Sequence, residues 1–278
     1  MRRACSERPD DVQTASPALR CLRAIAMLVQ LCLVWLGAVM VAPRLAVGRR
    51  NALVARFAAR TLAILGVSVR VLGARPLLDG PVLVVANHVS WLDVYLLNAV
   101  LGGTRHVAKS EVARWPVAGG IARGFGTFFH ARGNVRDAAR AKDAVAAALR
   151  AGERVVVFPE GTTSEGDEVG PFHAAFFQAA VDARVPVQAV AVRYPGPAGR
   201  PDPAAAFVGD MTFVASLARV LRRRQLEARL TFGPVVLPAD LTRRELAAVS
   251  HAFVALALEC TNWTPEPSAQ TLPLARAA

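Results

Sequence analysis

The spacing of apolar residues along this chain changes near Val67. Before that point, residues 24–42 form one run of 19 residues whose only polar side chain is Gln30. A helix of that length measures roughly 28 Å, close to the roughly 30 Å hydrocarbon core of a bilayer. After Val67, short apolar runs alternate with amphipathic stretches, a pattern that predicts an α/β fold, with a mixed sheet covered by helices.

The apolar run predicts an N-terminal membrane helix at residues 24–42, preceded by a polar segment at residues 1–23. Acidic residues in that segment and the length of the run argue against a cleaved signal peptide. A buried core helix is the structural alternative, and the sequence does not decide whether the helix spans the bilayer or only dips into it. The larger basic cluster after the run favours placing the domain that follows on the cytoplasmic side.

Residues 43–66 follow as a basic amphipathic segment, with a helix expected at residues 49–65. Its apolar stripe holds Leu53, Phe57 and Ile64, and Arg49 and Arg56 lie beside it. Arginine stems can lie along apolar surface with their heads at the phosphate level, which would hold the next domain against the membrane. A solvated basic helix packed on the domain is an equal alternative.

The domain that follows is expected at residues 67–260, with a flexible tail at residues 261–278. The chain up to about Ser16 is also polar and is expected to be mobile. Asn134 is suited to cap a helix. Strands are expected at residues 67–72, 82–86, 105–108, 127–130, 155–158, 187–194 and 228–236, and helices at 91–101, after Pro116, and at 134–150, 172–183, 213–225 and 241–259.

Composition narrows the classes of protein. With 54% hydrophobic and 19% charged residues, the chain can bury enough surface to offset its ordering entropy, which excludes intrinsic disorder. Its four cysteines show no metal-ligand or framework spacing, so neither a disulfide scaffold nor a zinc cluster is indicated. The net charge of +12 suits a polyanionic partner, either nucleic acid or an anionic lipid surface.

The sharpest chemical pattern is Asn87-His88-Val89-Ser90-Trp91-Leu92-Asp93, directly after the expected strand at residues 82–86. An aspartate in the first helical turn can reach back to a histidine at the strand end. Such a pair makes a general base, in which the carboxylate fixes the tautomer and the other ring nitrogen takes a proton from a hydroxyl. The chain has no G-x-S-x-G elbow, which favours direct attack by the substrate's hydroxyl. A simple helix cap is the alternative.

Two more polar segments follow expected strands, at residues 126–132 and 158–164. All three segments can therefore emerge at one edge of the sheet, where open α/β sheets bind ligands. Arg132 offers a planar fork for a phosphate or carboxylate, Glu160 can accept from a glycerol hydroxyl or from Arg132, and Gly161 permits close backbone approach.

Together these residues resemble the phospholipid/glycerol acyltransferase family, typified by bacterial 1-acyl-glycerol-3-phosphate acyltransferases. Its four motifs resemble residues 87–93, 126–132, 158–161 and 185–187, in the same order, and the residues around Lys109 are similar to a segment often seen between the first two. The resemblance implies that His88 is the base and Asp93 its partner. It also implies acceptor binding by Arg132, Glu160, Gly161, Gly126, Phe129 and Lys109.

The family's chemistry is implied in the same way. It transfers an acyl group from an acyl-carrier protein or coenzyme A thioester and needs no cofactor or metal. The expected reaction is O-acylation of lysophosphatidic acid at a membrane, with membrane lipids as further partners. Residues 158–164 and 170–172 also look like the branch that acylates lyso-ornithine lipid and related lysolipids. His173, where the family often has lysine, and Ala189, where it often has proline, depart from the pattern.

Rival hypotheses come from other classes. A non-catalytic lipid-binding protein would have no need of the base at His88. A nucleic-acid-binding protein would rest on charge alone, and the charges here lie beside an apolar run rather than among exposed aromatics. A metal hydrolase using His88, His106, His130 and Asp93 lacks a helical ligand spacing. The cluster of Arg219, Arg222, Arg223 and Arg224 is either a docking patch for a carrier protein or a solvated helix face.

Overall fold

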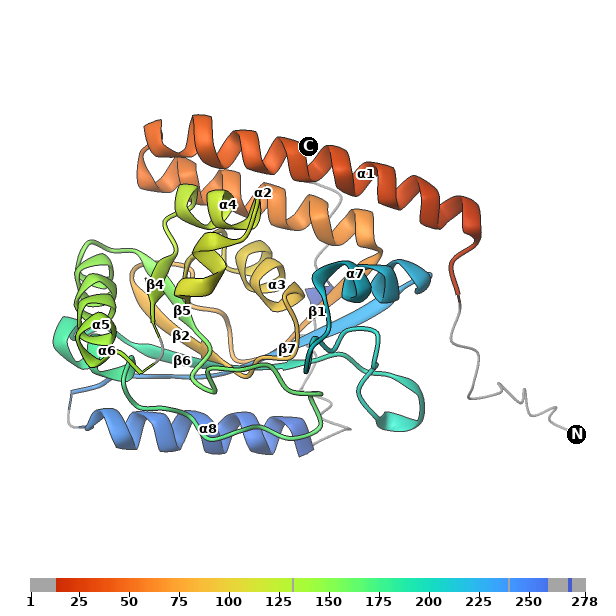
Figure 1. Ribbon diagram of the computed structural model, residues 1–278. Coiled ribbons are helices and arrows are strands. Elements are labelled where there is room, and N and C mark those ends of the chain that lie inside the picture. Colours follow the sequence, from red (N-terminus) through yellow and green to blue (C-terminus); the bar gives the residue numbers. More distant parts are fainter. Residues whose placement is uncertain (1–13, 132, 240, 260–269, 272–278) are drawn as a thin grey trace, which may run out of the picture.

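The computed structural model describes residues 14–131, 133–239, 241–259 and 270–271. These residues form one mixed sheet of eight strands in the order β4-β3-β5-β2-β6-β7-β1-β8. Helices cover both faces of the sheet (Figure 1), so the predicted fold class is confirmed. The strands are β1 (Val67–Gly73), β2 (Val82–Ala86), β3 (Arg105–Lys109), β4 (Phe128–His130), β5 (Arg154–Val157), β6 (Val187–Arg193), β7 (Leu226–Val236) and β8 (Gln270–Thr271).

The helices follow the predicted alternation. Asn134 caps its helix as predicted, because its side chain accepts a hydrogen bond from the Asp137 backbone N–H. The α-helices are α1 (Pro17–Leu36), α2 (Val47–Leu65), α3 (Leu92–Val100), α4 (Ala118–Gly124), α5 (Val135–Arg150), α6 (Phe177–Ala183), α7 (Phe213–Arg222) and α8 (Arg243–Glu259), with a π-turn at Gly37–Val41 and a 3₁₀-helix, η3, at Ser110–Arg114.

The central strand β2 explains why its sequence is apolar throughout. It pairs in parallel with β5 on one side and β6 on the other, and every one of its residues is buried. Val82 and Val84 join the core with α2, α3 and α7, whereas Leu83 and Val85 join the core with α5, α6 and α8. A strand covered on both faces needs apolar side chains at both.

Helices α1 and α2 form an antiparallel pair along one side of the molecule (Figure 1). Gln30, the one polar side chain of the apolar run, is buried and donates to the carbonyl of Phe57 at 3.2 Å and to the hydroxyl of Thr61 at 3.4 Å. Gly37 faces the Phe57 ring so closely that a Cβ there would lie 2.6 Å from it. Gln30 therefore serves helix pairing, which the sequence pattern did not show.

The opposite face of α1 is exposed and apolar. The helical segment from Pro17 to Arg44 has a mean hydropathy of 2.4 in its most apolar window, of which 28% is buried. Length and composition suit a membrane helix, whereas a core helix would be mostly buried. The exposed apolar side chains on it are Leu22, Ile25, Leu28, Val29, Leu33, Trp35, Leu36, Met40 and Val41.

The two ends of the chain differ from the prediction. Helix α1 begins at Pro17 rather than at residue 24, because Ser16 caps it and proline is favoured at the first helical position. Ala15, expected to be mobile, is buried and donates to the carbonyl of Arg222. In the expected flexible tail, Gln270–Thr271 form β8 against β1. The rest of residues 261–278 lie outside the described residues, as do residues 1–13.

Helix α2 is fixed to the sheet through charge as well as apolar contact. Arg50 on α2 forms an ion pair with Glu153 at the start of β5, and Arg105 on β3 pairs with the same carboxylate at 3.1 Å. Glu153 is buried, so the two guanidinium groups compensate a charge held away from water. The described basic helix is thus packed on the domain, with Arg49 and Arg56 exposed.

Candidate active site

The three polar segments singled out in the sequence meet at one edge of the sheet. Strands β2, β5, β3 and β4 run parallel to one another, so their carboxyl ends share that edge. His88 follows β2, Glu160 follows β5, Lys109 ends β3 and His130 ends β4. The predicted convergence is confirmed, although Arg132 itself lies outside the described residues.

Asn87 fixes the point at which the chain leaves β2. Its side-chain amide donates to the carbonyl of Val192 at 2.9 Å, and its oxygen accepts from the Val192 N–H at 2.7 Å. Asn87 is fully buried. This side chain takes the place of the next backbone pairing between β2 and β6, which frees the main chain to turn towards α3. The asparagine therefore sets the direction of His88.

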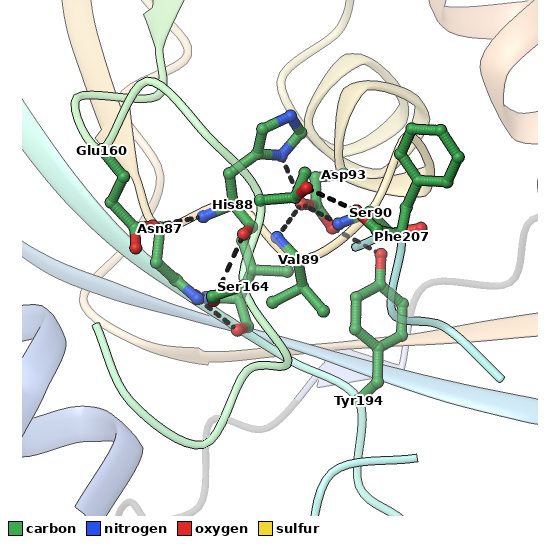
Figure 2. A network of polar contacts seen from close by, with 11 residues as sticks. Asn87, His88, Val89, Ser90, Asp93, Glu160, Ser164, Tyr194 and Phe207 are labelled. Carbon is green, nitrogen blue, oxygen red and sulfur yellow. Dashed lines mark hydrogen bonds and ion pairs between the residues drawn. The ribbon is translucent and has the colours of Figure 1, made fainter. Parts of the chain in front are cut away.

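His88 and Asp93 form the predicted pair (Figure 2). The Nδ1 atom of His88 lies 2.8 Å from Oδ2 of Asp93. The Asp93 side chain has no exposed surface, whereas that of His88 is 20% exposed. Because Asp93 occupies Nδ1, Nε2 is the ring nitrogen that can take a proton from a substrate. The geometry is that of a general base held in one tautomer.

The same carboxylate also organises the turn before α3. Oδ2 of Asp93 accepts from the backbone N–H groups of Val89 at 2.8 Å and Ser90 at 2.9 Å. Its other oxygen, Oδ1, accepts from the hydroxyl of Tyr194 at 2.6 Å. Asp93 therefore has both of the roles considered for the His-x₄-Asp pattern: it binds the backbone at the start of the helix, and it is the partner of the histidine base. The donors stabilise a buried negative charge.

Phe158 supports the His88 ring from behind. The two rings are stacked with centroids 3.9 Å apart and an interplanar angle of 11°. His106 also stacks on Phe158, with ring centroids 6.3 Å apart, and is buried beside Asn98 and Thr104. Burial, with the nearby His88 charge, lowers the pKa of His106 to about 3, so its imidazole is neutral at physiological pH.

This arrangement bears on the metal-hydrolase hypothesis. His88 and His106 each stack on the Phe158 ring, and His130 packs edge-on against Phe176. Across the described parts of the chain, no three His, Cys, Asp or Glu side chains are grouped as a metal ion would need. The histidines of that hypothesis therefore do not form one ligand set.

Glu160 binds the backbone of the catalytic turn, and its role in acceptor binding stays a prediction. Its Oε1 accepts from the backbone N–H of His88 at 2.7 Å, and its Oε2 accepts from that of Gly170 at 2.8 Å. Burial raises the pKa of Glu160, and the two backbone donors oppose that shift. The backbone oxygen of His88 in turn accepts from the N–H of Ser164 at 2.8 Å. The loop after β5 thus holds the histidine backbone at both its N–H and its carbonyl.

The other predicted acceptor-binding residues surround this centre. Gly161 has φ of +67° and follows Glu160 directly. Gly126 has φ of +78°, and its carbonyl accepts from Arg105 at 2.6 Å, which gives it a structural role in the loop before β4. Phe129 pairs with Ala108 in the β4–β3 ladder, one position before the pair that includes Lys109. Their roles in acceptor binding stay predictions.

Two side chains at the site were not identified from the sequence. Phe158 was assigned to the end of a strand and the start of the third motif, without a role of its own, and Tyr194 only to the end of another strand. Both come directly after parallel strands, β5 and β6, that flank β2. An aromatic residue immediately following a central parallel strand was the signal available, because such a residue lies at the same edge as His88.

The contacts of Glu160 predict the effect of replacing it with glutamine. The amide would present N–H groups to one of the two backbone donors, so a charge-assisted hydrogen bond worth about 1.5–3 kcal/mol is lost. We expect kcat to fall about tenfold or more with little change in acceptor KM, measured by steady-state acyl transfer. Glu165→Gln, an exposed carboxylate in the same loop, is the matched control. A raised acceptor KM at unchanged kcat would instead show direct acceptor contact.

Comparison with known proteins agrees with the fold and site. The family model described as Acyltransferase matches residues 68–193. A lyso-ornithine lipid O-acyltransferase from Pseudomonas aeruginosa is 38% identical over 200 residues, which cover 72% of this chain and 76% of that protein. The 1-acyl-sn-glycerol-3-phosphate acyltransferase of Neisseria meningitidis serogroup B is 37% identical over 185 residues, 66% of this chain and 71% of its own. The chain belongs to the acyltransferase family.

The class of enzyme follows from the same relatives, whose names place this chain among the acyltransferases of lysolipids. A solved structure agrees in fold. The crystal structure of the 1-acyl-sn-glycerophosphate acyltransferase from Thermotoga maritima aligns with a TM-score of 0.63 and 22% identity, covering 87% of this chain and 94% of that one. The two proteins therefore share a fold.

Proposed function

We propose that this protein is a membrane-associated O-acyltransferase that transfers a fatty acyl group from a thioester to the hydroxyl of a lysolipid, with lysophosphatidic acid as the expected acceptor. The observation that carries the mechanism is the contact of His88 Nδ1 with the buried Asp93 carboxylate at 2.8 Å, which leaves Nε2 for the acceptor.

The reaction proceeds by direct attack. Nε2 of His88 takes the proton of the acceptor hydroxyl as its oxygen bonds to the thioester carbonyl carbon, which gives a tetrahedral oxyanion. The C–S bond then breaks, the ester is released, and the imidazolium returns its proton to the departing thiolate. Asp93 stabilises the imidazolium between these two transfers.

The oxyanion requires donors from outside the catalytic turn. The backbone N–H of His88 is donated to Glu160, and those of Val89 and Ser90 are donated to Asp93. These three groups are therefore already engaged in forming the site. We assign oxyanion stabilisation to donors contributed by the neighbouring strand ends. Donors that already point at the developing charge in a site that excludes water contribute strongly to catalysis.

Membrane association is proposed through the exposed apolar face of α1. A groove of about 630 Å³ lies between the end of α1 and α4, with Trp35 and Trp115 in its apolar wall and Arg114 and Arg123 among its polar lining. Apolar walls beside guanidinium groups suit an anionic amphiphile, which is the chemistry of a lysolipid. We propose a bacterial inner-membrane location with the catalytic domain on the cytoplasmic side, and acyl-carrier protein or coenzyme A thioesters as donors.

Lyso-ornithine lipid is the second candidate acceptor. The relative from Pseudomonas aeruginosa bears that name, and residues 158–164 and 170–172 favour the same branch. His173 stands beside Phe172 in place of a lysine common in the family, so that lysine's permanent cation is missing for either acceptor.

The experiment offers both acceptors side by side to membranes containing the wild-type protein, with labelled acyl-carrier protein and, separately, acyl-coenzyme A. Ester formed from lysophosphatidic acid and lost in the His88→Ala variant is the expected result. If ester forms from lyso-ornithine lipid and not from lysophosphatidic acid, lyso-ornithine lipid is the acceptor and the proposed mechanism is retained. Formation of neither ester would contradict the proposed function.

A further inference from the structure

Tyr194 contacts the catalytic pair from a strand that carries none of the predicted site residues. It follows β6, which is parallel to β2, so it lies at the same sheet edge as His88. Its hydroxyl lies 2.6 Å from Oδ1 of Asp93 (Figure 2). Tyr194 is 1% exposed and Asp93 is fully buried, so no solvent competes for this contact.

The direction of the hydrogen bond is settled by the charge of its partner. Asp93 accepts from His88, Val89 and Ser90 through Oδ2, and Oδ1 has the tyrosine hydroxyl. Burial, together with the Asp93 carboxylate, raises the pKa of Tyr194 well above its usual value. The phenol is therefore protonated at all working pH values and donates to Asp93.

We propose that Tyr194 is a positioning residue for acyl transfer, which holds Oδ1 of Asp93 so that Oδ2 is directed at His88 and which sets the basicity of the His88 imidazole. The proposal rests on the base role of His88 put forward above. With Tyr194 present, the Asp93 carboxylate accepts from four donors, and without it from three. The more donors share its charge, the less strongly the carboxylate attracts the Nδ1–H of His88. Without the phenol, the Asp93 carboxylate attracts the Nδ1–H of His88 more strongly and so favours the imidazolium.

Other groups near His88 do not substitute for this contact. Those near it are Asp93 at the start of α3, Glu160 from the loop after β5, and His106 on β3, which also stacks on Phe158. Glu160 bonds the His88 backbone, and His106 is neutral above its pKa of about 3. Of these groups, Asp93 is the one that Tyr194 contacts.

The test is Tyr194→Phe, which removes one oxygen and keeps the ring. We expect kcat to fall about tenfold or more, as for loss of a hydrogen bond to a buried charge, with little change in acceptor KM. The acidic limb of the kcat/KM profile is expected to move to higher pH. Tyr95→Phe, at the chain's other tyrosine, is the matched control, since Tyr95 packs edge-on against Trp91 and should keep the wild-type profile.

The rate at each pH is divided by the fraction of folded protein measured at that pH, so partial unfolding cannot imitate the shift. A Tyr194→Phe profile identical to that of wild type would overturn the proposal.

A second measurement places Tyr194→Phe in an Asp93→Asn background. If the tyrosine acts through Asp93, it adds little to the loss already caused by Asp93→Asn. An equal, additional loss in both backgrounds would overturn the positioning role. Failure of the proposed function is distinguishable, because the wild-type protein would then form no ester. Failure of the assigned base is distinguishable as well, because His88→Ala and Asp93→Asn would then both retain the wild-type rate.

Discussion

Replacing His88 with alanine is expected to lower acyl transfer by about 10²–10⁴-fold, the usual contribution of a positioned general base. The imidazole is 20% exposed and stacks on Phe158, so its removal takes away the proton acceptor without removing a core side chain. The rate is measured as ester formed per mole of folded protein, with the folded fraction taken from thermal unfolding.

The matched control is His251→Ala. This histidine lies on α8, where it contacts Phe172, and α8 covers the opposite side of the sheet from the α1–α2 pair (Figure 1). It should retain the wild-type rate. A His88→Ala protein that is folded and transfers acyl groups at the wild-type rate would contradict the assigned base.

Introducing aspartates on the exposed face of α1 is expected to release the protein from membranes. Leu28 and Leu36 are 65% and 50% exposed, so Leu28→Asp with Leu36→Asp leaves the core intact. An aspartate costs about 2.5–3.5 kcal/mol at the centre of a membrane helix, and each 1.4 kcal/mol is roughly tenfold in partitioning. We expect the fraction that sediments with anionic vesicles to fall about a hundredfold or more.

The same change on α8 provides the comparison. Val249 and Leu256 are 48% and 54% exposed there, and Val249→Asp with Leu256→Asp should leave vesicle binding unchanged. Transfer to a short-chain, water-soluble lysolipid should persist in the α1 variant, because His88 and Asp93 are untouched. Full vesicle binding by the α1 variant would show that another surface holds the membrane.

The parts of the fold that could be predicted are the helices and strands whose structure is determined by their own residues. The run at residues 82–86 is apolar at every position, which indicated an element covered on both faces. Asn134 is a residue type favoured at helix N-caps, which indicated the start of the helix that follows it. The predicted start of α6 was wrong, because a helix was expected from Phe172 and α6 begins at Phe177. The His173 N–H instead donates to the carbonyl of Pro159, a contact with a residue distant in sequence.

The candidate site divides in the same way. His88 and Asp93 lie five positions apart, so local geometry was enough to pair them. Tyr194 lies 101 positions after Asp93 in the sequence. The two residues come into contact because β2 and β6 are neighbours in the sheet. Gln30 likewise stood out as a polar residue in an apolar run, yet its role required the packing of α2. Contacts between distant elements depend on topology, which a single sequence pattern does not contain.

Direct attack by the acceptor is the central claim, and it is tested by combining one product assay with one protein measurement. Purified wild-type protein in vesicles is mixed with acyl thioester and lysolipid, and thiol released, ester formed and intact protein mass are recorded together. The account predicts one ester per thiol and a protein of unchanged mass throughout turnover. An acyl adduct that forms on the protein and decays as ester appears, or thiol released without ester, would contradict it.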